Sequence, residues 1–288
     1  MKTLLYATDC TEHAKSALCC AYELSVKLGA DLVVLNVYDI PPITVSTTRP
    51  SKWIEKNTKE EYLALTRAYC SKTLGKDLEE VNTRIEVTKN SSISDGIIAK
   101  ADTLSVDLVI IGMKDEHSKR GLFAGDIAKA LLKKVPSPLL VIPNEMSKLT
   151  LENIVYATDL EQDDLFAIKK LATIANPFDA KIFVFHISTR DEYAGKEQME
   201  WFKELLQQHV SYKRLRFDLW FSDHVSEELK KYLQKVDADM LGMLEREHTG
   251  WRKLFHKDLV KKMGSQIKIP LMSFNMIAKD EILNPFKV

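Results

Sequence analysis

The feature that most constrains the fold of this chain is an internal repeat. The segment Tyr6-Ala7-Thr8-Asp9 returns 150 residues later as Tyr156-Ala157-Thr158-Asp159. Nearer the end of each copy the offset becomes 132 residues, as shown by the matches Asp107 with Asp239, Leu122-Phe123 with Leu254-Phe255, Asp126 with Asp258, and Pro138 with Pro270. Self-similarity of this length indicates two copies of one domain, with 18 surplus residues in the middle of the first copy.

Each copy alternates short apolar runs with longer amphipathic segments, which is typical of a parallel sheet built from right-handed β-α-β units. The runs are almost continuous in Leu, Ile and Val, as expected when helices cover both faces of a sheet. Five strands are predicted in the first copy, at Leu4–Ala7, Leu32–Val37, Arg84–Val87, Leu108–Gly112 and Leu139–Ile142. Five more are predicted in the second, at Ile154–Ala157, Lys181–His186, Arg216–Phe221, Met240–Leu244 and Leu271–Phe274.

The sequence therefore predicts an α/β protein with two tandem five-stranded domains, 1–146 and 151–288, and a boundary near 145–150. The first helix is expected over 11–28, with Thr11 as its N-cap and Gly29 as its stop. Its buried stripe is expected at Leu18, Ala21, Leu24 and Leu28. The surplus residues of the first copy are assigned to a Pro-rich loop, 40–51, and to a longer second helix.

Composition excludes several classes of function. Lys plus Arg and Asp plus Glu number 41 each, so the chain has no net positive charge to attract nucleic acid. No apolar run approaches the roughly 20 residues that span a bilayer, and the N-terminus is too short for a signal-peptide core. We expect a soluble cytoplasmic protein with no nucleic-acid or membrane partner.

All four cysteines, Cys10, Cys19, Cys20 and Cys70, lie in the first copy without metal-ligand spacing, and we interpret them as free thiols. Cys10 is expected to head a helix, where the helix dipole would lower its pKa, so a redox-sensing role stays open beside simple packing.

Open parallel sheets bind ligands at the carboxyl ends of their strands, at the point where the strand order reverses. In the first copy these ends are followed by Thr8, Asp9 and Cys10, by Tyr38 to Ile40, and by the segment 113–124 that leads into a helix near Gly125. A loop that leads into a helix can bind phosphate through its backbone N–H groups.

Two features carry a resemblance to the universal stress protein family: Ala7-Thr8-Asp9 after the first strand, and the segment 107–143 with its ending Pro138-Leu139-Leu140-Val141-Ile142-Pro143. The resemblance covers almost the whole chain, twice. It implies domains of the adenine-nucleotide α-hydrolase-like type. ATP-binding members carry Gly, two residues, Gly, nine residues, and then Gly followed by Ser or Thr.

In the first copy this pattern finds Gly112 and Gly125 at its first and third glycines, whereas Asp115 and Asp126 stand at the second glycine and at the hydroxyl. Two carboxylates beside a triphosphate oppose binding unless a metal ion such as Mg²⁺ intervenes. The resemblance also implies adenine-side contacts from Asp9 and from the backbone near Val37. Asp9 has an alternative interpretation as a helix cap.

In the second copy the corresponding residues are Leu244, Glu247, Lys257 and Asp258, which predicts that binding of ATP in the family's mode is lost there. The segment 251–257, Trp-Arg-Lys-Leu-Phe-His-Lys, is either an anion or partner-protein site or a packed aromatic pair with a solvated basic face. A zinc site is the alternative to packing or capping for four histidines of the second copy, His186, His224, His248 and His256.

No nucleophile–base motif is present, so the expected function is that of a non-catalytic stress-response protein that acts by binding. Two alternatives stay open: an ATP-binding switch in the first copy with slow hydrolysis at most, and a small-ligand or metal-binding enzyme at the strand ends of the second copy.

The resemblance further implies that the last strands of the two copies pair across a pseudo-two-fold axis, Val141-Ile142 against Leu271-Met272-Ser273. The chain is then an intramolecular pseudo-dimer, with a further homodimer as an alternative. An unidentified protein partner is expected. The tail, 275–288, is apolar enough to dock on the protein.

Overall fold

The computed structural model describes residues 1–40, 51–76, 82–113, 125–144, 146, 148–190, 195–245 and 268–275. The chain divides into two compact units. The first comprises Met1–Ser137 with Val141–Lys148, and the second comprises Pro138–Leu140 with Leu149–Val288.

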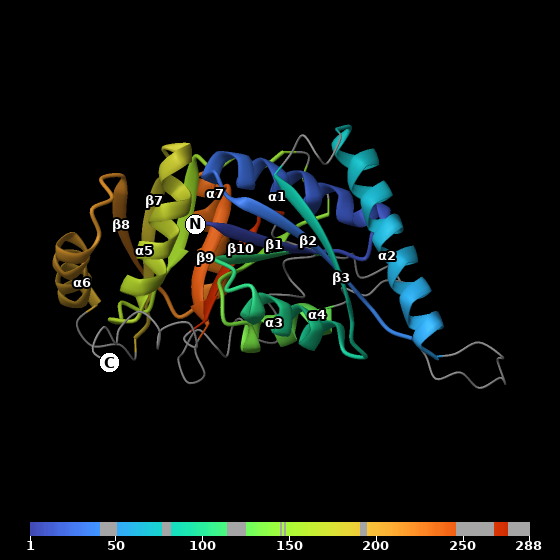
Figure 1. Ribbon diagram of the computed structural model, residues 1–288. Helices are drawn as coiled ribbons and strands as arrows, with labels where there is room; N and C mark the ends of the chain where they lie inside the picture. The colour runs from blue at the N-terminus through green and yellow to red at the C-terminus, as the bar shows by residue number, and fades with distance from the viewer. Residues whose placement is uncertain are drawn as a thin grey trace, which may run out of the picture. The chain divides into compact units, whose positions relative to one another are not determined.

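The first unit contains a parallel sheet with helices on both faces. Its strands are β1 (Thr3–Ala7), β2 (Asp31–Tyr38), β3 (Thr83–Lys89), β4 (Leu108–Gly112) and the second half of β5 (Leu139–Ile142), in the order β3-β2-β1-β4-β5. Helices α1 (Lys15–Leu28) and α2 (Ser51–Leu74) cover one face, and α3 (Ile93–Thr103) and α4 (Gly125–Lys134) cover the other (Figure 1). Because both faces are covered, β1, β2 and β4 are buried along nearly their whole length.

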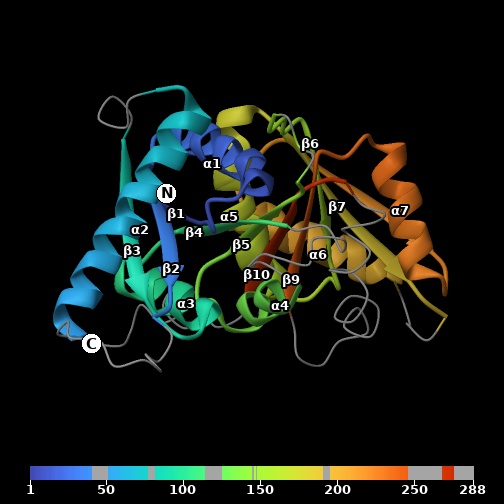
Figure 2. The same cartoon turned by 90° about the vertical axis from the view of Figure 1, so that its right-hand side faces the viewer.

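The second unit repeats this arrangement. Its strands are β6 (Asn153–Ala157), β7 (Lys181–Ser188), β8 (Leu215–Phe221), β9 (Met240–Glu245) and β10 (Leu271–Asn275), in the order β10-β9-β6-β7-β8. Its helices are α5 (Asp164–Ala175), α6 (Gly195–His209) and α7 (Val225–Lys235), and α7 packs on β7 while α5 packs on α6 (Figure 2). The ten predicted strands are confirmed, with ends that shift by at most a few residues.

The two offsets found in the sequence coincide with element boundaries. Strands β1 and β2 correspond to β6 and β7 at an offset of 150, whereas β3, α3, β4 and β5 correspond to β8, α7, β9 and β10 at 132. The surplus therefore lies between β2 and β3, where α2 has 24 residues and α6 has 15. The predicted longer helix is confirmed, and the Pro-rich loop falls on residues 41–50, outside the described part of the chain.

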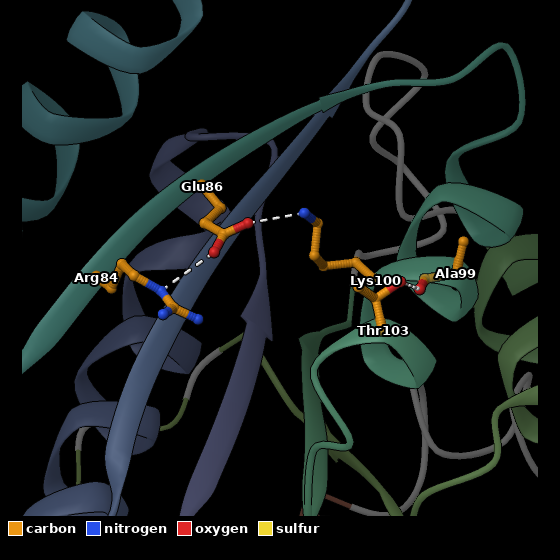
Figure 3. Close-up of polar contacts among 5 residues, drawn as sticks. All are labelled: Arg84, Glu86, Ala99, Lys100 and Thr103. Carbon is orange, nitrogen blue, oxygen red and sulfur yellow. Dashed lines mark hydrogen bonds and ion pairs between the residues drawn. The ribbon is translucent and has the colours of Figure 1, made fainter.

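An equivalent polar cluster holds each outer strand to the helix that follows it. In the first unit Glu86 of β3 accepts from Arg84 at 3.1 Å and from Lys100 of α3 at 2.7 Å (Figure 3). In the second unit Asp218 of β8 binds Arg216 at 3.2 Å and accepts from the hydroxyl of Tyr232 of α7 at 2.7 Å. A carboxylate and its Arg are thus common to both copies, and only the helical partner differs.

Within the described residues, no helix has the length and apolar character needed to cross a membrane.

Candidate functional site

The segment after β1 forms a compact turn built around Asp9. One carboxylate oxygen of Asp9 accepts from the backbone N–H of Thr11 at 3.1 Å and from its hydroxyl at 2.7 Å. Thr11 is the N-cap residue of the turn that follows, but its side chain makes no cap hydrogen bond, so the predicted side-chain cap of the first helix is wrong. A short 3-10 turn, η1 (Glu12–Ala14), follows, and α1 begins at Lys15. Gly29 ends α1 in the left-handed region, as predicted.

The residue after Asp9 fixes the shape of this turn. Cys10 has a left-handed φ of 59°, and its N–H donates to the hydroxyl of Thr8 at 3.0 Å. Leu160 repeats both features in the second unit, with a φ of 60° and a bond of 2.8 Å to Thr158. In both units a non-glycine residue adopts a left-handed φ in this turn. Such residues rarely adopt that conformation by themselves, so contacts with the surrounding structure hold it.

The thiol of Cys10 points into a polar cluster between β2 and α2. The amide of Asn36 donates to Cys10 Sγ at 3.3 Å and to the hydroxyl of Thr66 at 3.2 Å, and the Thr66 hydroxyl donates to the carbonyl of Tyr62 at 2.7 Å. Burial raises the pKa of Cys10, contrary to the lowering expected from a helix dipole. All four cysteines are free, as expected.

A small open cleft lies between the carboxyl ends of β1 and β4. Its walls come from the β1 turn, the start of α1 and the end of β4, and its lining residues are Ala7, Asp9, Thr11, His13, Ala14, Gly112 and Met113. The backbone N–H of Met113 donates to the carbonyl of Ile142 at 2.7 Å, which holds the end of β4 against β5. Two of the residues predicted from sequence, Asp9 and Gly112, therefore line one cleft.

The other two predicted residues occupy different positions. Val37 is 5% exposed in β2 and is not among the residues that line the cleft; its side chain faces α3 at Gly96. Gly125 is the first residue of α4, and Asp126 follows it with an exposed carboxylate 3.5 Å from Lys129. Asp115 lies outside the described residues.

Gly112 also has a packing role. A Cβ at this position would lie 3.2 Å from the Cβ of Ala17 and 3.9 Å from the Cα of Ala14, both on the segment that forms η1 and α1. Glycine therefore permits the close approach of this segment to the end of β4 and leaves the backbone of residue 112 accessible in the cleft.

The second unit fills the equivalent space differently. Its β9 carries Leu244 where β4 carries Gly112. Asp164, only 1% exposed at the start of α5, stands at the position of Ala14. Its carboxylate accepts from the hydroxyls of Tyr156 at 2.7 Å and Thr158 at 2.8 Å, and from the N–H of Glu161 at 3.2 Å.

The remaining sequence predictions for the second unit have mixed outcomes. His186 is buried in β7 with Nδ1 2.7 Å from the carbonyl of Thr158, and His224 precedes α7. Within the described residues no group of three or more His, Cys, Asp or Glu side chains has metal-site geometry. Glu247, Lys257, Asp258, the segment 251–257, His248 and His256 lie outside that part.

Sequence reasoning missed two polar residues of these sites, Asn36 and His13. Asn36 stands at the position equivalent to His186, each a polar residue within a mainly apolar strand. This pattern indicates that each side chain has a buried hydrogen-bond partner. His13 of the cleft gave no sign, because it falls in an exposed turn whose spacing matches no motif.

The chain is similar to known proteins in sequence and in fold. A family model described as the universal stress protein family matches residues 1–143. The crystal structure of a universal stress protein from Archaeoglobus fulgidus DSM 4304 has a similar fold, with a TM-score of 0.68 and 12% identity, covering 95% of this chain and 98% of that one. A functionally unknown protein from Pseudomonas aeruginosa PAO1 is also similar, with a TM-score of 0.61, 15% identity, and coverage of 97% and 95%. No curated protein matches the chain by sequence.

Proposed function

The first half of the chain, residues 1–143, belongs to the universal stress protein family, and on this premise we propose that the protein is a non-catalytic stress-response regulator that binds one adenine nucleotide in its first unit. Any hydrolysis of ATP is slow and incidental to this role. The regulatory output is binding to a protein partner.

The observation that carries the proposal is the cleft between β1 and β4. It combines a carboxylate, Asp9, with the side-chain-free backbone of Gly112 at the carboxyl edge of a parallel sheet. This edge is where open α/β sheets bind their ligands. Two hydrogen bonds from Thr11 orient the Asp9 carboxylate, which suits it to recognise an adenine or ribose edge by direct hydrogen bonding.

The phosphate end of such a ligand meets a less suitable environment. Gly112 leaves its backbone accessible in the cleft, but Asp126 places a carboxylate in the first turn of α4. Like charges repel, so a triphosphate would need Mg²⁺ bridging it to Asp126. A single phosphate extends less far from the nucleoside and would avoid this repulsion. The residues therefore suit the nucleoside and the first phosphate better than an unaccompanied triphosphate.

A second candidate function is partner binding without any nucleotide. The specific observation in its favour is the second unit, where Leu244 stands in place of Gly112 and Asp164 fills the position of Ala14. The second copy thus keeps the fold but carries different residues at two positions equivalent to those that line the cleft of the first. In this alternative the second unit has lost nucleotide binding and the first unit is losing it.

Calorimetric titration of the full chain with adenosine monophosphate, and with ATP plus Mg²⁺, tests the proposal. We expect saturable binding that Asp9→Ala weakens by about tenfold or more, because a directional hydrogen bond to the nucleoside is lost. Asp159→Ala is the matched control, since it removes the equivalent residue of the second copy and should leave binding unchanged. Absence of binding to wild-type protein would sink the nucleotide proposal and favour the second candidate.

A further inference from the structure

Strand β8 is the edge strand of the sheet in the second unit. It is the last strand in the order β10-β9-β6-β7-β8, and in the described part of the chain it pairs only with β7, which it lies beside in Figure 1. Every residue of β7 after Lys181 is buried, whereas no residue of β8 is fully buried. An edge strand presents a row of backbone groups with which another strand can pair.

The backbone groups on the open side of β8 belong to apolar residues. The carbonyl of Arg214, just before β8, accepts from the N–H of Ile182 at 2.9 Å. The N–H of Ser222, just after β8, donates to the carbonyl of Ser188 at 3.0 Å. Because alternate residues of a strand direct their backbone groups to opposite sides, the even-numbered residues of β8 bond to β7. The open side therefore receives the N–H and C=O groups of the odd-numbered residues, which are Leu215, Phe217, Leu219 and Phe221.

The charged side chains of β8 are complementary to a second copy of the same strand. Arg216 and Asp218 form an ion pair at 3.2 Å, with side chains 68% and 26% exposed. Asp218 also accepts from the neutral hydroxyl of Tyr232, so among the described residues its carboxylate binds one cation and has acceptor capacity for a second. When two β8 strands lie antiparallel with Phe217 opposite its twin, Arg216 of each strand faces Asp218 of the other. Moving the centre by one residue in either direction places Arg216 on Arg216 or Asp218 on Asp218, and like charges directly opposite are destabilising.

We propose that β8 is a dimerisation edge, at which two copies of this chain pair their β8 strands antiparallel about a two-fold axis at Phe217. The odd-numbered residues then form the hydrogen-bonded pairs. Arg216 and Asp218 form the non-hydrogen-bonded pairs, in which side chains lie closer together. Such an interface is isologous, because the same surface serves both partners. This self-association goes beyond the function proposed for the first unit and does not depend on a nucleotide.

The equivalent edge of the first unit, β3, is less suited to pairing. Arg84 and Glu86 form the same ion pair there, but Glu86 also binds Lys100 at 2.7 Å. A pair of β3 strands would therefore carry two cations for each carboxylate. In addition, β3 ends in Lys89 where β8 ends in Phe221, which is 60% exposed. A lysine on an edge strand opposes pairing, whereas an exposed apolar side chain favours it.

Sedimentation equilibrium of the full chain without nucleotide tests the proposal. The proteins compared are wild type, Arg216→Asp, and Arg84→Asp as the matched control on the equivalent edge. Both arginine side chains are more than half exposed, at 68% and 59%, so neither substitution removes a buried side chain. Urea denaturation checks that both variants remain folded.

We expect the wild type to form a dimer as its concentration rises. Arg216→Asp should weaken this dimer at least about tenfold, because two contacts between Arg and Asp become two contacts between carboxylates. Arg84→Asp should dimerise as the wild type does. Hydrogen exchange provides a measurement that needs no substitution: the backbone N–H groups of Phe217 and Leu219 should exchange more slowly as the dimer forms.

Three results would overturn the proposal. A wild type that stays monomeric would leave the β8 edge to a strand from a different protein. A dimer that Arg216→Asp leaves unchanged, or that Arg84→Asp weakens equally, would use another surface. Equal exchange of the Phe217 and Leu219 amides in monomer and dimer would exclude pairing through β8. In each case nucleotide binding by the first unit would still stand, because calorimetry measures it separately.

Discussion

At residue 112 the absence of a side chain serves packing and ligand access at once. The neighbouring Ala17 would lie 3.2 Å from an added Cβ, which is closer than such contacts normally are. A glycine retained at this position is therefore weak evidence for ligand binding by itself. The two roles can be separated by experiment, because packing depends on Ala17 and access to the cleft does not.

The packing role predicts a specific coupling. Gly112→Ala should lower the free energy of unfolding by about 1 kcal/mol, because the added methyl group crowds Ala17. In an Ala17→Gly background the same substitution should cost little, which gives a coupling of at least about 0.5 kcal/mol. Urea denaturation of the four proteins measures it. Equal costs in both backgrounds would show that Gly112 is not constrained by packing on α1.

Cys70 makes stability depend on alkaline pH. It is fully buried on α2, and burial raises its pKa to about 12. In the unfolded chain a thiol ionises at about 8.5, so between these two values the folded state retains a proton that the unfolded state has lost. Stability is then present below the unfolded pKa and falls as pH rises, by at most about 1.4 kcal/mol per pH unit for this one group.

We expect Cys70→Ala to have a shallower decline of unfolding free energy above about pH 9 than wild type. Cys20, whose pKa is also raised to about 12 by burial, contributes a decline in the same direction that remains in this variant. Denaturation at a series of alkaline pH values measures both slopes. Identical slopes would mean that the thiolate of Cys70 is tolerated in the fold.

At the scale of the element, the sequence predicted the strands far better than the helix starts. A strand buried on both faces shows itself as an apolar run such as Leu32–Val37, and this signal does not depend on any single contact. The start of α1 depends on the turn before it, in which the Thr11 hydroxyl donates to Asp9 and a 3-10 turn separates Thr11 from Lys15, the first residue of α1. Local composition does not reveal this arrangement.

The residues of the candidate site, like the elements, could be predicted from the sequence only in part. The sequence placed Asp9 and Gly112 at the ends of neighbouring strands, and they do line one cleft. The expected contact from the backbone near Val37 stays a prediction, and Val37 is not among the residues that line the cleft. Nor did the sequence identify Asp164, whose three donors all lie in the adjoining stretch 156–161, because only the folded turn between β6 and α5 brings them to its carboxylate.

Equivalent helices of the two copies begin differently, which predicts opposite effects of capping substitutions. Ser92 caps α3 by accepting from the N–H of Asp95 at 3.3 Å, whereas His224 at the same position of α7 makes no side-chain cap. Ser92→Ala should lower the unfolding free energy by about 1 kcal/mol, and His224→Ser should raise it by up to about that amount. Thermal or urea denaturation measures both. Destabilisation by His224→Ser would show that the imidazole supports α7 in another way.

At the scale of the whole molecule, one fold appears twice with two different sets of residues at its strand ends. Only the first unit combines an open cleft with a glycine at the end of the fourth strand among the described residues. If the proposed function is correct, the full chain should bind one nucleotide. Native mass spectrometry with adenosine monophosphate measures the ratio, and two per chain would show that Leu244 and Asp164 do not close the second site.

The pairing of the last strands of the two copies stays a prediction from the sequence, as does a further homodimer. If the intramolecular pseudo-dimer satisfies the contact that separate domains would otherwise make, a homodimer must use another surface, and β8 offers one. Arg216→Asp should then give a monomer mass in sedimentation equilibrium at concentrations where the wild type begins to dimerise. A dimer of this variant as stable as that of the wild type would favour a homodimer through the last strands.

The position of the surplus between β2 and β3 has a consequence for the ease with which each copy folds. The pairing of Leu4 with Leu108 joins residues 104 positions apart, and the pairing of Ile154 with Met240 joins residues 86 apart. Because the entropy of closing a loop grows only with the logarithm of its length, this difference costs roughly 0.2 kcal/mol. Added sequence in this crossover is therefore nearly neutral for chain closure. Residues added to this crossover therefore leave the free energy of pairing the first and fourth strands of a copy almost unchanged.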